Sequence, residues 1–155
     1  MTVGPPAESA TLAFIRRFLL ASLAVGILGT ACELILLGHV DSAAQWIPMI
    51  ALAVALLLLA WHTLRPGALT VRLIQLLMCA FIVFGIVGVG LHYDGNVEFE
   101  RELHPKETGV MFLRHTLAGA TPVLAPGSMV LLGLLGIAYA YRHPSAVGSD
   151  RRSAS

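Results

Sequence analysis

The run FLLASLAVGILGTACELILLG at Phe18–Gly38 decides the fold of this chain. It is apolar along its length and is interrupted by one carboxylate, Glu33. A helix rises about 1.5 Å per residue, so a run of this length can cross roughly 30 Å of hydrocarbon. The run therefore predicts a membrane-spanning helix, and we expect further helices of the same kind to pack against it.

The composition of the whole chain agrees with this interpretation. Its 155 residues are 57% hydrophobic and only 12% charged, whereas soluble domains are about a quarter charged. Three more apolar runs, Trp46–His62, Leu69–Tyr93 and Leu124–Tyr141, are each long enough to span a bilayer. None alternates with a period of two, so helices are expected and not barrel strands. The predicted fold is an all-α polytopic membrane protein, a four-transmembrane-helix bundle with a short helical extracytoplasmic cap.

We expect one membrane domain over residues 1–155. Its expected parts are a loose N-terminus at 1–15, spans at about 18–39, 46–63, 69–92 and 124–142, an outer loop at 94–123, and a loose C-terminus at 145–155. Within the outer loop, Asn96 is expected to cap a short helix that stops before Pro105. Gly109–Ala118 is expected to form a second short helix at the mouth of the bundle.

The distribution of cations predicts the orientation. Four spans place both termini on one side, which then carries seven Lys and Arg residues against three on the other. The seven are Arg16, Arg17, Arg65, Arg72, Arg142, Arg151 and Arg152. Because cytoplasmic segments carry the excess of Lys and Arg, both termini are expected in the cytoplasm and the loop at 94–123 outside it.

Small residues recur at helical spacing within the spans. Ser22, Gly26, Gly29 and Glu33 share one face of the first span, and small residues let a neighbouring backbone approach closely. This predicts that the face points into the bundle and carries Glu33 with it. The other glycines expected at helix contacts are Gly85, Gly88, Gly133 and Gly136. The sequence GILG precedes Glu33, and the similar sequence GIVG precedes His92. This match indicates either that the chain contains two pseudo-repeated helical hairpins or that apolar segments align by chance.

The first candidate site is a polar one near the outer ends of the spans. A carboxylate inside a span is costly, so Glu33 is either functional or hydrogen-bonded across helices. His92 occupies the corresponding position of the third span, and His39 and Asp94 lie near the same mouth. These four residues are the candidates for handling a cation or a proton.

The second candidate site is a metal site on the outer segment. Imidazole and carboxylate groups together suit Zn²⁺, Cu²⁺ or another divalent ion, and the candidate ligands are His92, Asp94, His104 and His115. The spacing matches no HExxH, CxxC or EF-hand pattern, so a solvated acidic surface is the alternative. Apart from a divalent metal, no cofactor is predicted.

Other chemistry finds less support. Cys32 and Cys79 form no CxxC pair and are expected as buried small hydrophobes. The histidines lie near span ends, which does not suit a haem held between two of them. No nucleophile elbow, phosphate loop or nucleic-acid-reading pattern is present. A lipoprotein signal ending at Cys32 is disfavoured because the apolar run continues beyond it. We therefore name no catalytic residue, and an enzyme is the least supported class.

The segment GATPVLAPGSMVLLGLLGIAYAYRHP at Gly119–Pro144 resembles the C-terminal part of small bacterial four-span membrane proteins, an uncharacterised family with no established activity. The likeness extends over most of the chain, including the regions around Glu33 and residues 96–100. The resemblance implies a location in the bacterial inner membrane and adds no mechanism.

Two functional hypotheses follow. The first is a non-catalytic accessory or scaffolding subunit, which associates with partner membrane proteins or with a second copy through its small-residue faces or its outer cap. The second is binding or permeation of a cation, proton or metal, with Glu33 and His92 below an acidic outer mouth. The direction in which Glu33 points separates the two.

Overall fold

The computed structural model describes residues 9–38, 42–119, 121, 123 and 125–146. Within these residues the main elements are five helices: α1 (Ala10–Leu36), α2 (Ala43–Leu64), α3 (Ala68–Leu103), α4 (Gly109–Leu117) and α5 (Gly127–Ala140). The all-α prediction is therefore confirmed. By length and composition α1, α2 and α3 can each cross a membrane, whereas α5 is apolar but has only 14 residues. These helices indicate a membrane protein.

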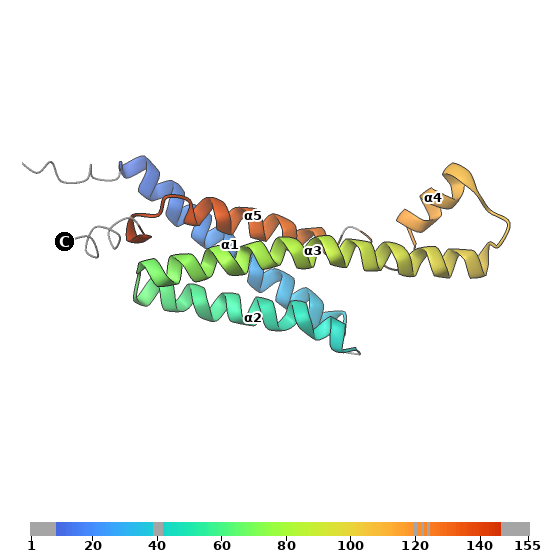
Figure 1. The fold of residues 1–155 in the computed structure, drawn as a ribbon, viewed down its shortest axis with the longest axis horizontal. Coiled ribbons are helices and arrows are strands. Elements are labelled where there is room, and N and C mark those ends of the chain that lie inside the picture. Colours follow the sequence, from blue (N-terminus) through green and yellow to red (C-terminus); the bar gives the residue numbers. More distant parts are fainter. Residues whose placement is uncertain (1–8, 39–41, 120, 122, 124, 147–155) are drawn as a thin grey trace, which may run out of the picture.

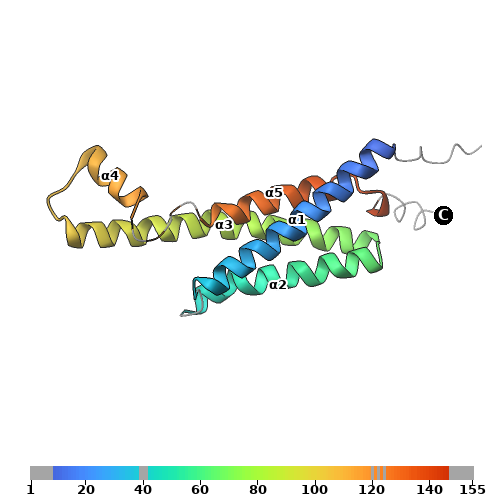
Figure 2. The same ribbon diagram turned by 180° about the vertical axis from the view of Figure 1, so that it is seen from behind.

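The helices α1, α2, α3 and α5 lie side by side, and α3 continues well beyond the other three (Figures 1 and 2). Its 36 residues span about 54 Å, nearly twice the thickness of the hydrocarbon core. Its most extensive contact is with α5. Among the described helices α4 packs on α3 alone, so the end of α3 carries α4 away from the rest of the protein.

The buried apolar core lies where α1, α2, α3 and α5 meet. Leu23 and Ile27 of α1 contribute to it, as do Leu52 of α2, Phe81 of α3 and Leu132 of α5. No side chain of α4 belongs to this core. The core therefore holds the helix bundle together, and the α3–α4 hairpin must be held by other interactions.

Glycines bring the helices into close contact. A Cβ atom on Gly133 would lie 2.6 Å from the backbone oxygen of Met78, and one on Gly85 would lie 2.9 Å from that of Pro126. Gly26, Gly88 and Gly136 are similarly crowded by side chains of neighbouring helices, but Gly29 faces open space. Five of the six glycines expected at helix contacts therefore lie at contacts within this chain.

Arg16 ties the first helix to the end of the last. Its Nη1 donates hydrogen bonds to the backbone oxygens of Tyr139 (2.9 Å) and Tyr141 (3.1 Å), and its Nη2 donates to that of Arg142 (3.1 Å). The last carbonyls of a helix have no partner within the helix, and a cation there also interacts favourably with the helix dipole. The start of α1 and the end of α5 consequently lie at the same end of the bundle (Figure 1).

Several expected boundaries need correction. Helix α1 begins at Ala10, where the Ser9 hydroxyl accepts a hydrogen bond from the Leu12 amide at 3.2 Å, so the expected loose segment at 1–15 is too long. Residues 1–8 and 147–155 lie outside the described residues. Of the expected span at 124–142, helix α5 covers Gly127–Ala140 and starts directly after Pro126.

The largest correction concerns the expected outer loop at 94–123. Its first ten residues belong to α3, which passes through Asn96 without a break. An interior glycine such as Gly95 costs a helix only about 1 kcal/mol. Ending one helix and starting another would cost more free energy. The new helix would have N–H groups without partners at its start, and its nucleation is unfavourable. The second expected short helix corresponds to α4 (Gly109–Leu117).

The two cysteines were expected to be buried, and this is wrong. Cys32 of α1 and Cys79 of α3 are both free and exposed on their helices. Apolar side chains such as Leu28 and Leu76 are exposed beside them, as expected for surfaces that face lipid. Hydrophobicity alone therefore does not predict burial inside this bundle.

Candidate metal centre

Four side chains with metal-binding groups meet at the outer end of the α3–α4 hairpin. They are Glu100, His104, Glu107 and His115, each of which offers one ligand atom, and these atoms all lie within 4.8 Å of one another. Glu100 lies in the last turn of α3, and His104 follows the helix directly. Glu107 lies in the connection to α4, and His115 lies in α4 itself.

The local sequence explains this arrangement. Glu100 and His104 are four residues apart, so they lie on the same side of α3. The helix ends at Leu103 because Pro105 disfavours a helical conformation of His104 before it. The chain then turns, with the Glu107 amide bonded to the His104 carbonyl oxygen at 3.0 Å, and α4 begins at Gly109 in a left-handed conformation (φ 71°). Helix α4 then returns toward α3 (Figure 1), and His115 of α4 joins the cluster.

The four side chains form two hydrogen-bonded pairs. His104 Nδ1 lies 3.0 Å from Glu100 Oε2, and His115 Nδ1 lies 2.8 Å from Glu107 Oε2. The two imidazole rings are 5.7 Å apart between centroids. Glu100 is only 7% exposed, so its carboxylate needs the polar partners that the cluster supplies.

The cluster has the donor types and nearly the spacing of a metal site. Zinc binds imidazole nitrogen and carboxylate oxygen at about 2.0–2.2 Å, so two ligand atoms of one ion lie at most about 4 Å apart. The observed spread of 4.8 Å would close by small rotations of side chains. Two imidazoles with two carboxylates suit Zn²⁺ and similar transition metals better than Ca²⁺ or Mg²⁺, which prefer oxygen ligands alone.

A buried asparagine holds α4 in the position that the cluster requires. Asn96 Nδ2 donates to the backbone oxygens of Thr116 (2.9 Å) and Thr121 (2.8 Å), and Asn96 Oδ1 accepts from the amide (3.1 Å) and hydroxyl (2.8 Å) of Thr121. A Cβ on Gly119 would lie 2.9 Å from Asn96 Cγ, so a glycine lets the chain pass closely. The sequence predicted that Asn96 caps a helix, and it did not predict that Asn96 holds α4 in place.

The predicted metal ligands divide into two groups. His104 and His115 lie in the cluster, together with Glu100 and Glu107, which were not among the predicted ligands. His92 and Asp94 do not belong to it. They precede Glu100 by eight and six residues, which places them about 12 and 9 Å further back along α3. Imidazole and carboxylate groups therefore do meet, as expected, but they meet further along the hairpin than His92 and Asp94.

The predicted polar site around Glu33 needs a larger correction. Glu33 is exposed on α1 and does not point into the bundle. Helix α1 contacts α5 at Gly26 and then diverges from it toward the start of α2 (Figure 2), which leaves Gly29 and Glu33 outside the helix contact. His39, the third member of this site, lies outside the described residues.

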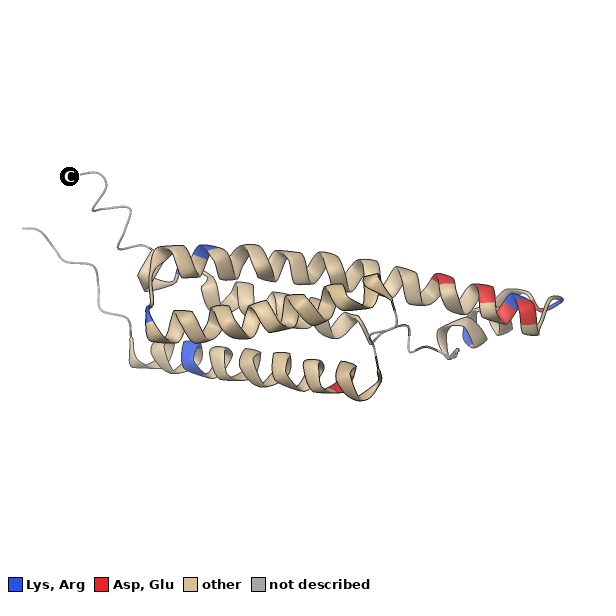
Figure 3. Cartoon of the chain, turned by 90° about the horizontal axis from the view of Figure 1, so that it is seen from below, with Lys and Arg blue, Asp and Glu red and all other residues tan. Residues whose placement is uncertain are grey.

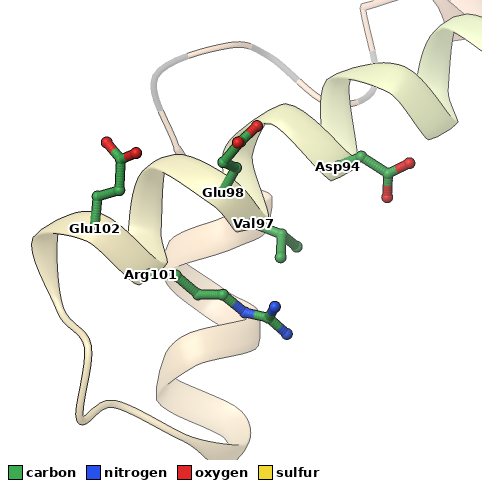
Figure 4. A pocket seen from close by; sticks show the side chains of 5 residues that line it. All are labelled: Asp94, Val97, Glu98, Arg101 and Glu102. Carbon is green, nitrogen blue, oxygen red and sulfur yellow. The ribbon is translucent and has the colours of Figure 1, made fainter.

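The outer part of α3 also presents an acidic surface. Asp94, Glu98 and Glu102 border an open hollow of about 460 Å³ with Val97 and Arg101. Their side chains extend in different directions and do not converge on one point (Figure 4). Acidic residues gather at this end of the protein together with Arg101, Lys106 and Arg114, whereas the opposite end carries basic residues (Figure 3). The surface therefore raises the local concentration of cations around the hairpin without forming a site itself.

A second polar cluster lies at the opposite end of the protein. His62 of α2 is buried, and its Nδ1 lies 2.7 Å from the hydroxyl of Thr70 on α3. Its ring packs edge-on against Tyr139 of α5 and against His143. His62, at the end of the second apolar run, therefore makes contacts that join α2 to α3 and α5.

No protein family, characterised protein or solved structure matches the chain. Its function must therefore be argued from its own geometry. The feature of that geometry with the most specific chemistry is the Glu/His cluster of the α3–α4 hairpin.

Proposed function

We propose that this chain is an integral membrane protein that binds a divalent transition-metal ion on the α3–α4 hairpin, outside the bilayer. The observation that carries the proposal is the convergence of four ligand atoms, from Glu100, His104, Glu107 and His115, within 4.8 Å. Four protein ligands fill the coordination shell of Zn²⁺, whereas catalytic zinc sites keep one position open for water. The site therefore favours binding or sensing of the metal over catalysis.

We infer four membrane crossings, by α1, α2, α3 and α5. The 14 residues of α5 cover about 21 Å, and the apolar residues that adjoin it would complete the crossing. The excess of arginines at one end supports cytoplasmic termini, and the acidic hairpin would then face the extracytoplasmic side. The resemblance of residues 119–144 to small bacterial membrane proteins supports the bacterial inner membrane.

The accessory or scaffolding hypothesis has less support. It requires small-residue faces, or the outer cap, to contact a partner. Gly85, Gly133 and Gly136 lie within the contact between α3 and α5, so they leave no free face for a partner. The metal-binding hypothesis remains, with its site moved from Glu33 and His92 to the hairpin.

Calorimetric titration of the full chain in detergent tests the proposal. We expect one equivalent of Zn²⁺ to bind the wild type. His115→Ala and Glu100→Gln should each weaken binding at least about tenfold, since changes around metal ligands commonly have effects of 10–100-fold.

The matched control is the double variant Glu98→Gln/Glu102→Gln, which removes two exposed carboxylates of the same helix but no cluster ligand. It should bind Zn²⁺ with nearly unchanged affinity. Equal losses in the control and in His115→Ala would mean that the acidic surface attracts ions without a defined site. Equal affinities for Ca²⁺ and Zn²⁺ would also contradict the proposal.

A further inference from the structure

An apolar groove runs between α2 and α3, on the outward side of two helices that can cross a membrane. Its walls include Leu57 and Trp61 of α2 and Leu73 and Leu77 of α3, and all of its lining residues are apolar. Its volume of about 570 Å³ lies within the range of about 300–1,000 Å³ typical of ligand sites. The groove is thus large enough to hold part of a ligand and offers that ligand only apolar contacts.

Two arginines lie at one end of the groove. Arg65 follows Trp61 by one helical turn, and its amide donates a hydrogen bond of 2.8 Å to the Trp61 carbonyl oxygen at the end of α2. Arg65 directly follows the last residue of α2, so it lies at the end of the helix that lines the groove. Arg72 directly precedes Leu73 on α3, and both arginines are exposed. The groove is therefore apolar along its length and cationic at this end.

We propose that this groove binds an acyl chain of an anionic phospholipid and that Arg65 and Arg72 bind its headgroup phosphate. The guanidinium group matches phosphate oxygens with paired N–H donors. Tryptophan and arginine both favour the level of the headgroups, which places the hydrocarbon tail along the leucines. Basic pockets between transmembrane helices bind anionic lipid headgroups by the same combination. This proposal does not depend on the metal site, which lies at the other end of α3.

Tryptophan fluorescence tests it, because Trp61 lines the groove and the chain has only one other tryptophan, Trp46. In the Trp46→Phe protein, reconstituted in vesicles, brominated phosphatidylglycerol should quench Trp61 at an about fivefold lower mole fraction than brominated phosphatidylcholine. One cation near the membrane surface contributes about this ratio. Arg65→Gln should lower the preference about fivefold. Arg17→Gln removes an exposed arginine near the start of α1, which lies at the same end of the protein, and should leave the preference unchanged.

Three results would overturn the proposal. Equal quenching by the two lipids would mean that the groove does not select an anionic headgroup. Equal effects of Arg65→Gln and Arg17→Gln would mean a general attraction to the charged surface. Weak quenching by both lipids, together with a dimer in native mass spectrometry, would mean that a second copy covers the groove. In a Trp61→Phe protein, Trp46 reports on the other end of α2 and should show no preference.

Discussion

Asn96 controls the position of the metal-binding hairpin at the scale of a single residue. It is 1% exposed, and both polar atoms of its amide are used by the chain that returns from α4. Because α4 contributes nothing to the apolar core, these hydrogen bonds and the contact with α3 hold it in place. His115 reaches the cluster only while α4 stays in that position.

The Asn96→Ala variant should therefore loosen the hairpin without unfolding the bundle. It leaves the carbonyl oxygens of Thr116 and Thr121 without their partner, a loss of about 1–3 kcal/mol for buried polar groups. We expect faster hydrogen exchange in residues 109–118 and an about tenfold or greater loss of Zn²⁺ affinity, with unchanged exchange in α2. Glu98→Ala, at an exposed position of the same helix, is the control. Unchanged exchange in α4 of the Asn96 variant would show that Asn96 does not position the hairpin.

The donor types of the metal cluster could be predicted from the sequence, but their partners could not. All four predicted ligands carry side chains that can bind a metal, so the sequence alone does not distinguish among His92, Asp94, His104 and His115. Which of them meet depends on where α3 ends, which Pro105 sets locally, and on how α4 returns. The return of α4 depends on contacts between residues 20 or more positions apart, such as Asn96 with Thr116. Glu100 belongs to the cluster because it lies on the same side of α3 as His104.

At the scale of the helices, apolar runs predicted the order of the helices that form the bundle, but three of them are long and α5 is shorter than expected. Polarity misplaced the ends of these helices. The change from Leu91 to Asp94 marks a change of surroundings for α3, not the end of the helix. A helix satisfies its own backbone both in lipid and in water, so it can cross that boundary unbroken. Similarly, α1 was assigned an inward face from its small residues, yet its crossing with α5 uses Gly26 and leaves Gly29 open.

These two environments of glycine give a prediction with an internal control. Gly133→Ala would place a Cβ 2.6 Å from the Met78 carbonyl oxygen, so the α3–α5 contact must open at a cost of about 1–3 kcal/mol. Gly29→Ala meets nothing within 4 Å and should be neutral or stabilise the helix by up to about 1 kcal/mol. Unfolding of the two purified proteins in denaturing detergent measures the difference. Equal stabilities would contradict the close α3–α5 contact.

At the scale of the whole molecule, the chain is polarised along its long axis. The end where α1 begins and α5 finishes carries arginines, whereas the protruding end of α3 carries most of the described acidic residues together with Arg101, Lys106 and Arg114 (Figure 3). The sequence predicted this segregation of charge from the order of the apolar runs. It did not predict that a single helix would carry the acidic end so far from the core, since that follows from the continuity of α3.

The proposed topology predicts opposite accessibility at the two ends. In a protein with Cys32 and Cys79 replaced by alanine, Val110→Cys on α4 should react with a membrane-impermeant maleimide in intact cells with a permeabilised outer membrane. Thr63→Cys, near the end of α2, should react only after the inner membrane is opened. Both side chains are exposed, so differences in burial do not confound the comparison. Labelling of Thr63→Cys in intact cells would reverse or refute the orientation.

The central claim is that the hairpin forms a defined metal site. X-ray absorption at the zinc edge, on the full chain loaded with one equivalent of Zn²⁺, tests it most directly. We predict a first shell of four nitrogen and oxygen atoms at about 2.0 Å and outer-shell scattering from two imidazole rings. His115→Ala should remove the scattering of one ring. A shell of six oxygens without imidazole scattering, or a shell that contains sulfur, would contradict the account.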